Sequence, residues 1–154
     1  GCKYLIFRTS WVYAARGNNF AKTMLRLAKD RETLSVIADQ VGAPTGADLI
    51  ADVTALAIQQ AVKRDELVGI YHLASGGEVS WHGYASHVIK FARANGEALA
   101  VTAVNPIETT AYPTPARRPL NSRLNTQKLR DKFCLHLPDW QSGVTRMLRE
   151  VLNK

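Results

Sequence analysis

Two hydroxyl side chains and a large aromatic side chain stand together at Thr9, Ser10 and Trp11, directly after the apolar run at residues 4–7. Such a run predicts a short buried strand, and in α/β sheets the ligand crevice opens at the carboxyl ends of the strands. We therefore expect Thr9, Ser10 and Trp11 to face a ligand. The alternative is that Trp11 and Tyr13 pack into the core, because buried aromatic side chains are common.

Cationic side chains follow in a connection at residues 105–122 that contains four prolines. Loops of this length without regular structure are usually functional or disordered, and a guanidinium group can bind phosphate oxygens bidentately. We expect the loop to cover a substrate and to supply phosphate contacts through Arg118, with Arg123 just beyond it. The competing interpretation is that Arg117, Arg118 and Arg123 pin the loop to acidic side chains of the domain.

Other kinds of chemistry find little support in the sequence. His82 and His87 are five residues apart on an expected helix and so lie on different faces, which argues against a metal-binding pair. Ser10 and Ser122 have no nearby histidine and acid that would indicate a nucleophile. The two cysteines form no Cys-x-x-Cys pair, so they indicate neither a disulfide framework nor a zinc site.

The elements that must position these residues follow an alternating strand and helix pattern, which predicts an α/β fold. We expect strands at residues 4–7, 34–37, 70–74 and 99–103, and helices at residues 19–30, 45–64, 80–95, 129–133 and 140–151.

Capping residues mark where three of these helices begin. Asn18 or Asn19 and Ser80 are suited to cap helices, and Thr45 with Asp48 three residues later fits a capping box. The apolar stripe expected to bury the second helix consists of Leu49, Val53, Leu56, Ala57 and Val62.

Composition sets broad limits on the class of protein. With 154 residues, 46% hydrophobic and 21% charged, the chain can form one globular domain. No apolar run approaches the roughly 18 residues of a membrane span, and no signal-peptide layout is present, so we expect a soluble cytoplasmic protein without a membrane partner. The net charge of +7 and the pI near 9.7 raise the alternative of a nucleic-acid module. The basic residues do not cluster, however, and a locally positive cleft would equally suit an anionic small ligand, so we expect no nucleic-acid partner.

Several motifs in order resemble the extended short-chain dehydrogenase/reductase family, and together they cover essentially the whole chain. They are Arg8-Thr9-Ser10-Trp11-Val12-Tyr13 with Asn18-Asn19-Phe20, and then residues 39–45, 69–73, 116–119 and 121–124.

This resemblance implies the C-terminal part of an NAD(P)-binding Rossmann-like fold. Residues 1–154 would form a single fragment, comprising a late Rossmann strand and helix and the substrate-binding C-terminal domain. The family holds its cofactor on a Gly-rich turn and donates a proton through a Tyr-x-x-x-Lys pair, and neither pattern occurs here. We therefore expect the chain to begin in mid-domain, to lack the N-terminal dinucleotide-binding half that holds NADPH or NADH, and to be inactive alone.

The resemblance also assigns residues to a dTDP-sugar nucleotide. In the family, the tryptophan that matches Trp11 lies against the deoxysugar, and an indole face suits the apolar side of such a ring. Asn19, Arg118 and Arg123 match plausible diphosphate contacts. Some bacterial relatives are said to hold Mg²⁺ where subunits meet, and Asp48 and Glu150 could join such a carboxylate site; as ordinary residues they would be a helix-dipole acid and a surface charge.

Two points stay open at this level. A homodimer is possible for a full-length protein of this family. A non-catalytic member, of the type of the methionine adenosyltransferase regulatory subunit, is the alternative to a reductase, and a measurement of sugar-nucleotide binding would distinguish the two.

Overall fold

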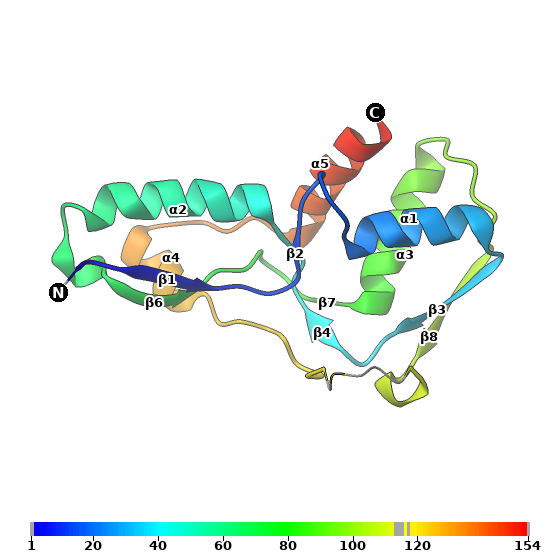
Figure 1. The fold of residues 1–154 in the computed structure, drawn as a ribbon, viewed down its shortest axis with the longest axis horizontal. Helices are drawn as coiled ribbons and strands as arrows, with labels where there is room; N and C mark the ends of the chain where they lie inside the picture. Colours follow the sequence, from blue (N-terminus) through cyan, green and yellow to red (C-terminus); the bar gives the residue numbers. More distant parts are fainter. Residues whose placement is uncertain (1, 113–115, 117, 154) are drawn as a thin grey trace.

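The computed structural model describes residues 2–112, 116 and 118–153, and it confirms the expected α/β alternation (Figure 1). The helices are α1 (Phe20–Asp30), α2 (Ala47–Ala61), α3 (Trp81–Ala94), α4 (Gln127–Phe133) and α5 (Trp140–Leu152), with short 3₁₀ turns at Asp65–Leu67 and Thr109–Ala111. The strands are β1 (Leu5–Arg8), β2 (Val12–Tyr13), β3 (Thr33–Ile37), β4 (Val41–Gly42), β5 (Thr45–Gly46), β6 (Gly69–His72), β7 (Val79–Ser80) and β8 (Ala103–Ile107). None of the helices in this part of the chain has the length and apolar character needed to cross a membrane.

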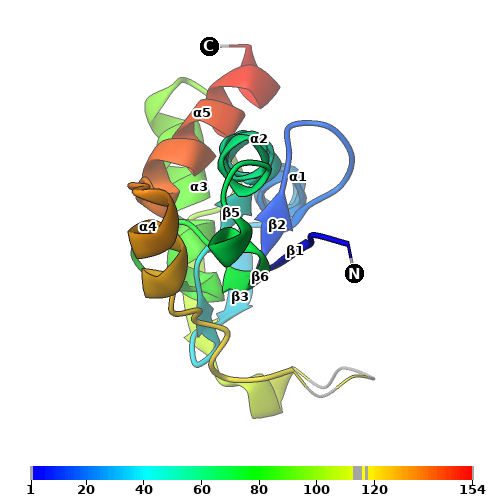
Figure 2. The same cartoon turned by 90° about the vertical axis from the view of Figure 1, so that its left-hand side faces the viewer.

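The strands pair in twos rather than in one broad sheet. β1 pairs with β6, β2 with β5 and β3 with β8, all in parallel, whereas β4 and β7 run antiparallel. One hydrophobic cluster joins α1, α3, α5 and β3, and a second joins α2, α4 and β6. The molecule is therefore elongated, with the short pairs β2–β5 and β4–β7 near its middle (Figures 1 and 2).

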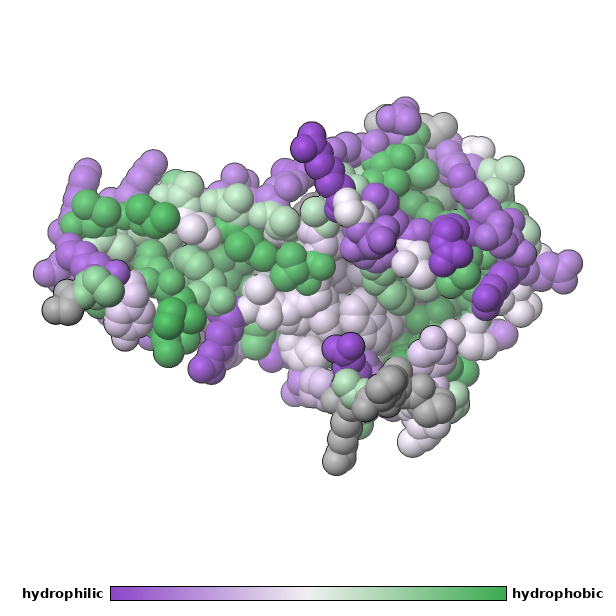
Figure 3. Space-filling model, viewed as in Figure 1, coloured by the Kyte–Doolittle hydropathy of each residue, from purple (hydrophilic) through white to green (hydrophobic). Residues whose placement is uncertain are grey.

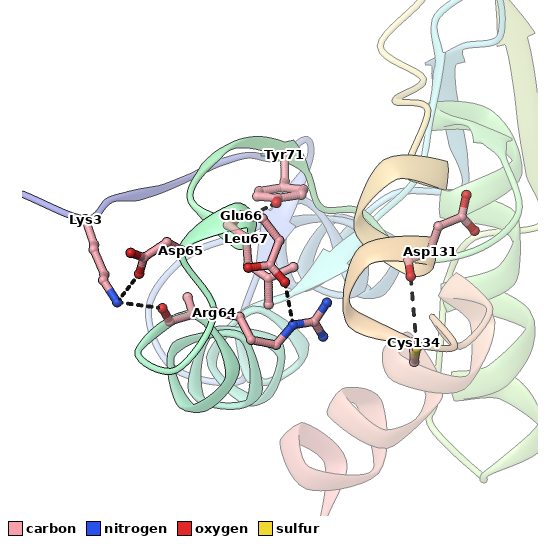
Figure 4. A network of polar contacts seen from close by, with 9 residues as sticks. Lys3, Arg64, Asp65, Glu66, Leu67, Tyr71, Asp131 and Cys134 are labelled. Carbon is pink, nitrogen blue, oxygen red and sulfur yellow. Dashed lines mark hydrogen bonds and ion pairs between the residues drawn. The ribbon is translucent and has the colours of Figure 1, made fainter.

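Polar contacts hold the second cluster together at the start of the chain (Figure 4). Lys3 Nζ donates to the carbonyl oxygen of Val62 at 2.9 Å and forms an ion pair with Asp65. Tyr71 Oη, which is buried, donates to the carbonyl oxygen of Leu67 at 2.7 Å, and burial raises the pKa of this phenol. These contacts hold β1 and β6 beside the C-terminal end of α2.

The expected burial of β1 is confirmed only in part, because Leu5 and Phe7 pack against the second cluster whereas Ile6 does not, and part of the burial expected for α2 is wrong. Ile6 in β1 is 48% exposed, and Leu56 and Val62 on the second helix and at its end are 46% and 65% exposed. The reason is that, within the described residues, β1 pairs only with β6, and α2 buries one face only, at Val53, Ala57 and Ala61. Apolar side chains consequently gather on the face over α2 and β1 (Figure 3).

The expected strand at residues 99–103 lies further along the chain, at Ala103–Ile107. Val101 is buried, but its N–H donates to the carbonyl of Ala28 and its own carbonyl accepts from Arg93, so it joins a helix pair rather than a sheet. The proline at position 106 predicts a loop, but it lies within β8. It is tolerated there because β8 is an edge strand, where the missing N–H of proline costs no ladder hydrogen bond.

Two of the three expected helix caps are confirmed. Asn19 Oδ1 accepts from the N–H of Lys22, and Ser80 caps α3 in the same way. The capping box at Thr45 is wrong, because Gly46 occupies the N-cap of α2. The buried Thr45 hydroxyl instead donates to the carbonyl of Ala43 and accepts from the N–H of Ser75. It therefore ties the start of α2 to the loop after β6.

Candidate functional site

A cavity of about 680 Å³ lies where the chain leaves β1, enters β4 and begins α3. Its lining combines hydroxyl, amide, aromatic and guanidinium side chains: Thr9, Ser10, Trp11, Gln40, Trp81, Arg118, Pro119, Asn121, Ser122 and Leu124. The structure thus brings together four of the residues that the sequence suggested for a ligand, from segments far apart in the chain. They are Thr9, Ser10, Trp11 and Arg118.

The wall formed by residues 118–124 is fixed to β4 by backbone hydrogen bonds. Val41 donates its N–H to the carbonyl of Leu120, and Ser122 donates its N–H to the carbonyl of Val41, each at 2.8 Å. This pairing places the segment beside β4 as a parallel bridge. Arg118 at the start of the wall is exposed, and no ion pair involves it within the described residues.

Trp11 adopts an unusual backbone conformation at the cavity. Its φ of +49° lies in the left-handed region, which is a genuine outlier for a bulky side chain and costs of order 1–3 kcal/mol. The carbonyl of Trp11 accepts a hydrogen bond from the N–H of Thr45 at 3.2 Å. Such strain persists only where the surroundings fix the residue, and the indole of Trp11 is indeed held on both sides.

The two faces of the Trp11 indole are both covered. The ring of Trp81 stacks on it with centroids 3.6 Å apart and planes 14° apart. A methyl group placed on Gly42 would lie 2.8 to 3.1 Å from three adjacent ring atoms of Trp11, so the Gly42 backbone lies against the opposite face. In this structure Trp11 therefore presents the edge of its indole to the cavity, rather than the face that the sequence suggested for a sugar ring.

A directed chain of hydrogen bonds runs from Trp81 away from the cavity. Trp81 Nε1 donates to Gln40 Oε1 at 3.2 Å, and Gln40 Nε2 donates to Thr109 Oγ1 at 3.1 Å. Thr109 then donates from its hydroxyl to Asp39 Oδ1 at 2.7 Å and from its N–H to the same carboxylate. These hydrogen bonds from Thr109 lower the pKa of Asp39, because they stabilise the charged form.

Ser10 lines the cavity, and its hydroxyl oxygen is buried beneath the surface of that lining. This Oγ has no hydrogen-bond partner in the described part of the chain. A buried polar group without a partner costs about 1–3 kcal/mol, so a ligand whose binding brought this hydroxyl within reach would gain from bonding it. The Tyr13 hydroxyl is likewise buried without a partner in the described chain, but Tyr13 belongs to the hydrophobic core and does not line this cavity.

Asn19 and Arg123 do not line the cavity. Asn19 uses both ends of its amide at the helix start, accepting from Lys22 and donating to the carbonyl of Ala14 at 2.6 Å. Arg123 forms an ion pair with Glu78 at 3.0 Å and also donates to Asn121 Oδ1. Arg123 therefore fits the interpretation in which a loop arginine is pinned to an acid; Arg117 lies outside the described residues.

Asp48 and Glu150 line a second, smaller cavity of about 300 Å³ with Arg146. Arg146 Nη2 lies 2.7 Å from Asp48 Oδ2, so the nearest cation to this carboxylate is a guanidinium. Among the residues that the structure describes, no group of three or more histidines, cysteines or acids is placed to hold a metal ion. Within one chain Asp48 is therefore paired with Arg146, and a Mg²⁺ site completed by a second subunit stays a prediction.

Six of the lining residues were not expected in the site: Gln40, Trp81, Pro119, Asn121, Ser122 and Leu124. Gln40 and Trp81 are the two of these that contact the Trp11 wall through side-chain interactions. Gln40 stands inside the motif at residues 39–45 that carried the family resemblance, which was the available signal. Trp81 directly follows the helix cap Ser80, and a tryptophan at a helix start is as easily assigned to the core. The folded chain shows that both residues line the cavity. This contact distinguishes a site residue from an ordinary core residue.

The α/β chain, with its parallel β1–β6 pair and a mixed polar and aromatic cavity at the carboxyl end of β1, matches the substrate-binding half of solved reductases with the extended short-chain dehydrogenase/reductase fold. Within that class, the chain belongs to the RmlD substrate binding domain family, whose model matches residues 1–153.

Relatives of known name are similar along nearly the whole chain. dTDP-4-dehydrorhamnose reductase from Shigella flexneri is 63% identical over 149 residues, which is 97% of this chain and 50% of that protein. The structure of dTDP-4-dehydrorhamnose reductase from Bacillus anthracis in complex with NADP superposes with a TM-score of 0.79 at 38% identity, covering 97% of this chain and 49% of that one. The corresponding structure from Clostridium acetobutylicum gives a TM-score of 0.80 at 30% identity, with 98% and 49% covered. The chain thus spans about half the length of these relatives.

Proposed function

We propose that this chain is the substrate-binding half of a dTDP-4-dehydrorhamnose reductase, which reduces a 4-keto deoxysugar nucleotide to dTDP-L-rhamnose. The observation that carries the proposal is the single cavity shared by Thr9, Ser10, Trp11 and Arg118. This cavity lies in a chain that is 63% identical to the Shigella flexneri reductase along almost its entire length. A cytoplasmic location and a homodimer of the full-length protein remain predictions.

The cofactor would be held elsewhere in a longer protein. The sequence contains no Gly-x-Gly-x-x-Gly turn to hold a pyrophosphate and no Tyr-x-x-x-Lys pair, so the residues present here do not fit NADPH or NADH. NADPH use is supported by the NADP complex of the Bacillus anthracis relative. We propose that the exposed apolar face over β1 and α2, which includes Ile6, Leu56 and Val62, packs against the N-terminal dinucleotide-binding half.

Within the cavity, the residues of this chain would bind and orient the nucleotide sugar. Ser10 Oγ, buried and unpaired in the described chain, would bond a sugar hydroxyl or keto oxygen. The edge of the Trp11 indole would limit how the deoxysugar ring can lie. Arg118, exposed in the same lining, would bind the diphosphate, because a guanidinium matches two phosphate oxygens at once.

Calorimetric titration with dTDP-L-rhamnose tests this proposal. We expect stoichiometric binding by the full-length protein. Ser10→Ala should bind more weakly at an equal or higher melting temperature, because the substitution removes a buried hydroxyl that has no partner in the described chain. Gln60→Leu serves as the control, since Gln60 donates to the carbonyl of Phe133 far from the cavity.

Three results would count against the proposal. A folded full-length protein that does not bind dTDP-L-rhamnose excludes the reductase function. Binding of the nucleotide sugar without any NADPH-dependent turnover favours a non-catalytic regulatory member of the family. Tight NADPH binding by residues 1–154 alone would contradict the assignment of the cofactor to another half.

A further inference from the structure

We propose that Gln40 is a positioning residue, which holds Trp81 and through it the Trp11 indole at the wall of the cavity. The identity of the ligand rests on the proposed function, whereas the positioning rests on geometry alone. Gln40 is only 5% exposed, yet it lines the cavity and makes hydrogen bonds at both ends of its amide. A buried glutamine with both ends satisfied is fixed in one orientation.

The direction of each hydrogen bond in this network is determined by chemistry. An indole N–H can only donate, so the oxygen of the Gln40 amide must face Trp81. The amide nitrogen then faces Thr109 and donates a hydrogen bond to its hydroxyl oxygen. The Thr109 hydroxyl directs its own proton to the carboxylate of Asp39, which leaves its oxygen free to accept. Reversing the amide would place two donors against each other at Trp81, so the network permits a single arrangement.

This arrangement reaches the cavity through ring stacking. Trp81 covers one face of Trp11 at 3.6 Å, and the backbone of Gly42 covers the other. Trp11 keeps its left-handed backbone between these two supports. If Gln40 could not accept a hydrogen bond, the part-buried Nε1 of Trp81 would lose its partner and the ring would gain by turning toward water. Trp11 would then lose one support, and the wall that faces the deoxysugar would change shape.

The test compares Gln40→Leu with Gln40→Glu in the full-length reductase. Leucine removes the acceptor for Trp81, whereas a glutamate oxygen keeps it. Two closely stacked indoles give a coupled circular dichroism band, which is identified as the signal that disappears in Trp11→Phe. The second readout is the Kd for dTDP-L-rhamnose, measured with the Kd for NADPH as an internal control. Gln60→Leu, which removes a part-buried glutamine hydrogen bond elsewhere, is the matched control for general destabilisation.

We expect Gln40→Leu to lose the coupled band and to raise the Kd for the nucleotide sugar on the order of tenfold, with NADPH binding unchanged. Gln40→Glu keeps the acceptor for Trp81 but loses the donor to Thr109 and places a second carboxylate near Asp39, so it should retain an intermediate part of both signals. Gln60→Leu should retain both signals fully. If Gln40→Leu does not fold, Thr109→Val replaces it in the test. Thr109 does not line the cavity, and its substitution removes the hydroxyl that accepts a hydrogen bond from Gln40, so the coupled band should again become weaker.

The proposal is overturned if Gln40→Leu and Thr109→Val keep the coupled band. It is also overturned if they lose the band but bind the nucleotide sugar like the wild type. Equal losses in Gln40→Leu and Gln60→Leu would also overturn it, because they would indicate destabilisation only. A wild-type protein that shows the band but binds no dTDP-L-rhamnose would refute the proposed function, and the response of the band to Gln40→Leu would still decide the positioning role.

Discussion

Gly42 lies so close to the indole of Trp11 that a methyl group on its α-carbon would come within 2.8 Å of Cε2. Real Cβ atoms do not approach a ring this closely, so either the indole or β4 must move when a side chain is added. Since Trp81 blocks the other face of the ring at 3.6 Å, the indole has little room to retreat. The cavity can therefore keep this shape only if residue 42 has no side chain.

We expect Gly42→Ala to weaken binding of dTDP-L-rhamnose on the order of tenfold and to destabilise the fold by about 1–3 kcal/mol, as overpacking usually does. The control is Gly143→Ala, whose added methyl would lie 2.6 Å from Tyr13 Oη and does not reach this cavity. Its clash is partly offset, because alanine is favoured over glycine inside α5 by about 1 kcal/mol. Calorimetry and urea denaturation on both variants separate the effects. The prediction is wrong if the two variants lose stability alike and Gly42→Ala binds normally.

Local patterns in the sequence predicted the local features of this fold. Asn19 and Ser80 cap their helices as expected, because a cap depends only on a side chain and the N–H groups two or three residues later. The expectation failed for Leu56 and Val62 because burial depends on what packs against a helix. It failed for Val101, whose apolar alternation indicates a strand only where a partner strand is available.

The candidate site shows the same division between local and tertiary information. The stretch from Thr9 to Trp11 was recognised because it follows a strand, and it does line the cavity. The role of Gln40 could not be predicted, since its partners Trp81 and Thr109 lie 41 and 69 residues away in the chain. Nor could the sequence show that Arg146 occupies the carboxylate of Asp48. Hydrogen bonds between distant residues become visible only in the folded chain.

Tyr13 makes stability depend on pH in the alkaline range. Burial raises its pKa to about 12 from an ordinary value near 10, so the fold favours the neutral phenol. The stabilisation is complete below the unfolded pKa of about 10 and is lost as the pH rises from there through about 12. One pKa unit corresponds to about 1.4 kcal/mol. Between pH 9 and pH 12 the free energy of unfolding should therefore fall by roughly 1–3 kcal/mol more in the wild type than in Tyr13→Phe.

Urea denaturation at a series of pH values measures this difference. Tyr112→Phe is the control, because Tyr112 is 57% exposed and lies outside the core; its alkaline profile should match that of the wild type. Tyr84 is also buried and its pKa is also raised, so some alkaline loss should remain in Tyr13→Phe. Identical profiles for the wild type and Tyr13→Phe would show that Tyr13 ionises without an effect on folding.

The ion pair between Asp48 and Arg146 leads to a prediction about Mg²⁺. An ion that bound at a concentration of 100 times its Kd would stabilise the protein by about 2.7 kcal/mol. We expect MgCl₂ to leave the melting temperature of this chain equal to that in NaCl of matched ionic strength, because a guanidinium already occupies Asp48. The two side chains are 63% and 66% exposed, so Arg146→Ala should cost less than about 1 kcal/mol. A Mg²⁺-specific rise that disappears in Asp48→Asn would contradict this expectation.

Arg118 and Arg123 should differ in what they do, although both are arginines in one segment. Arg118 lines the cavity and has no ion pair within the described residues, whereas Arg123 is paired with Glu78. A charge-assisted contact with the diphosphate should contribute about 1.5–3 kcal/mol, so Arg118→Ala should weaken dTDP binding about ten- to a hundredfold at an unchanged melting temperature. Arg118→Lys should recover little of this affinity, because an ammonium group cannot bind two oxygens in the planar geometry of a guanidinium.

Arg123→Ala should bind dTDP normally and lose at most about 1 kcal/mol of stability, since exposed ion pairs are weak. Calorimetry and thermal melting on the three variants test these outcomes, and an Arg118→Ala protein that binds dTDP like the wild type but melts early would show that Arg118 stabilises the fold rather than the ligand.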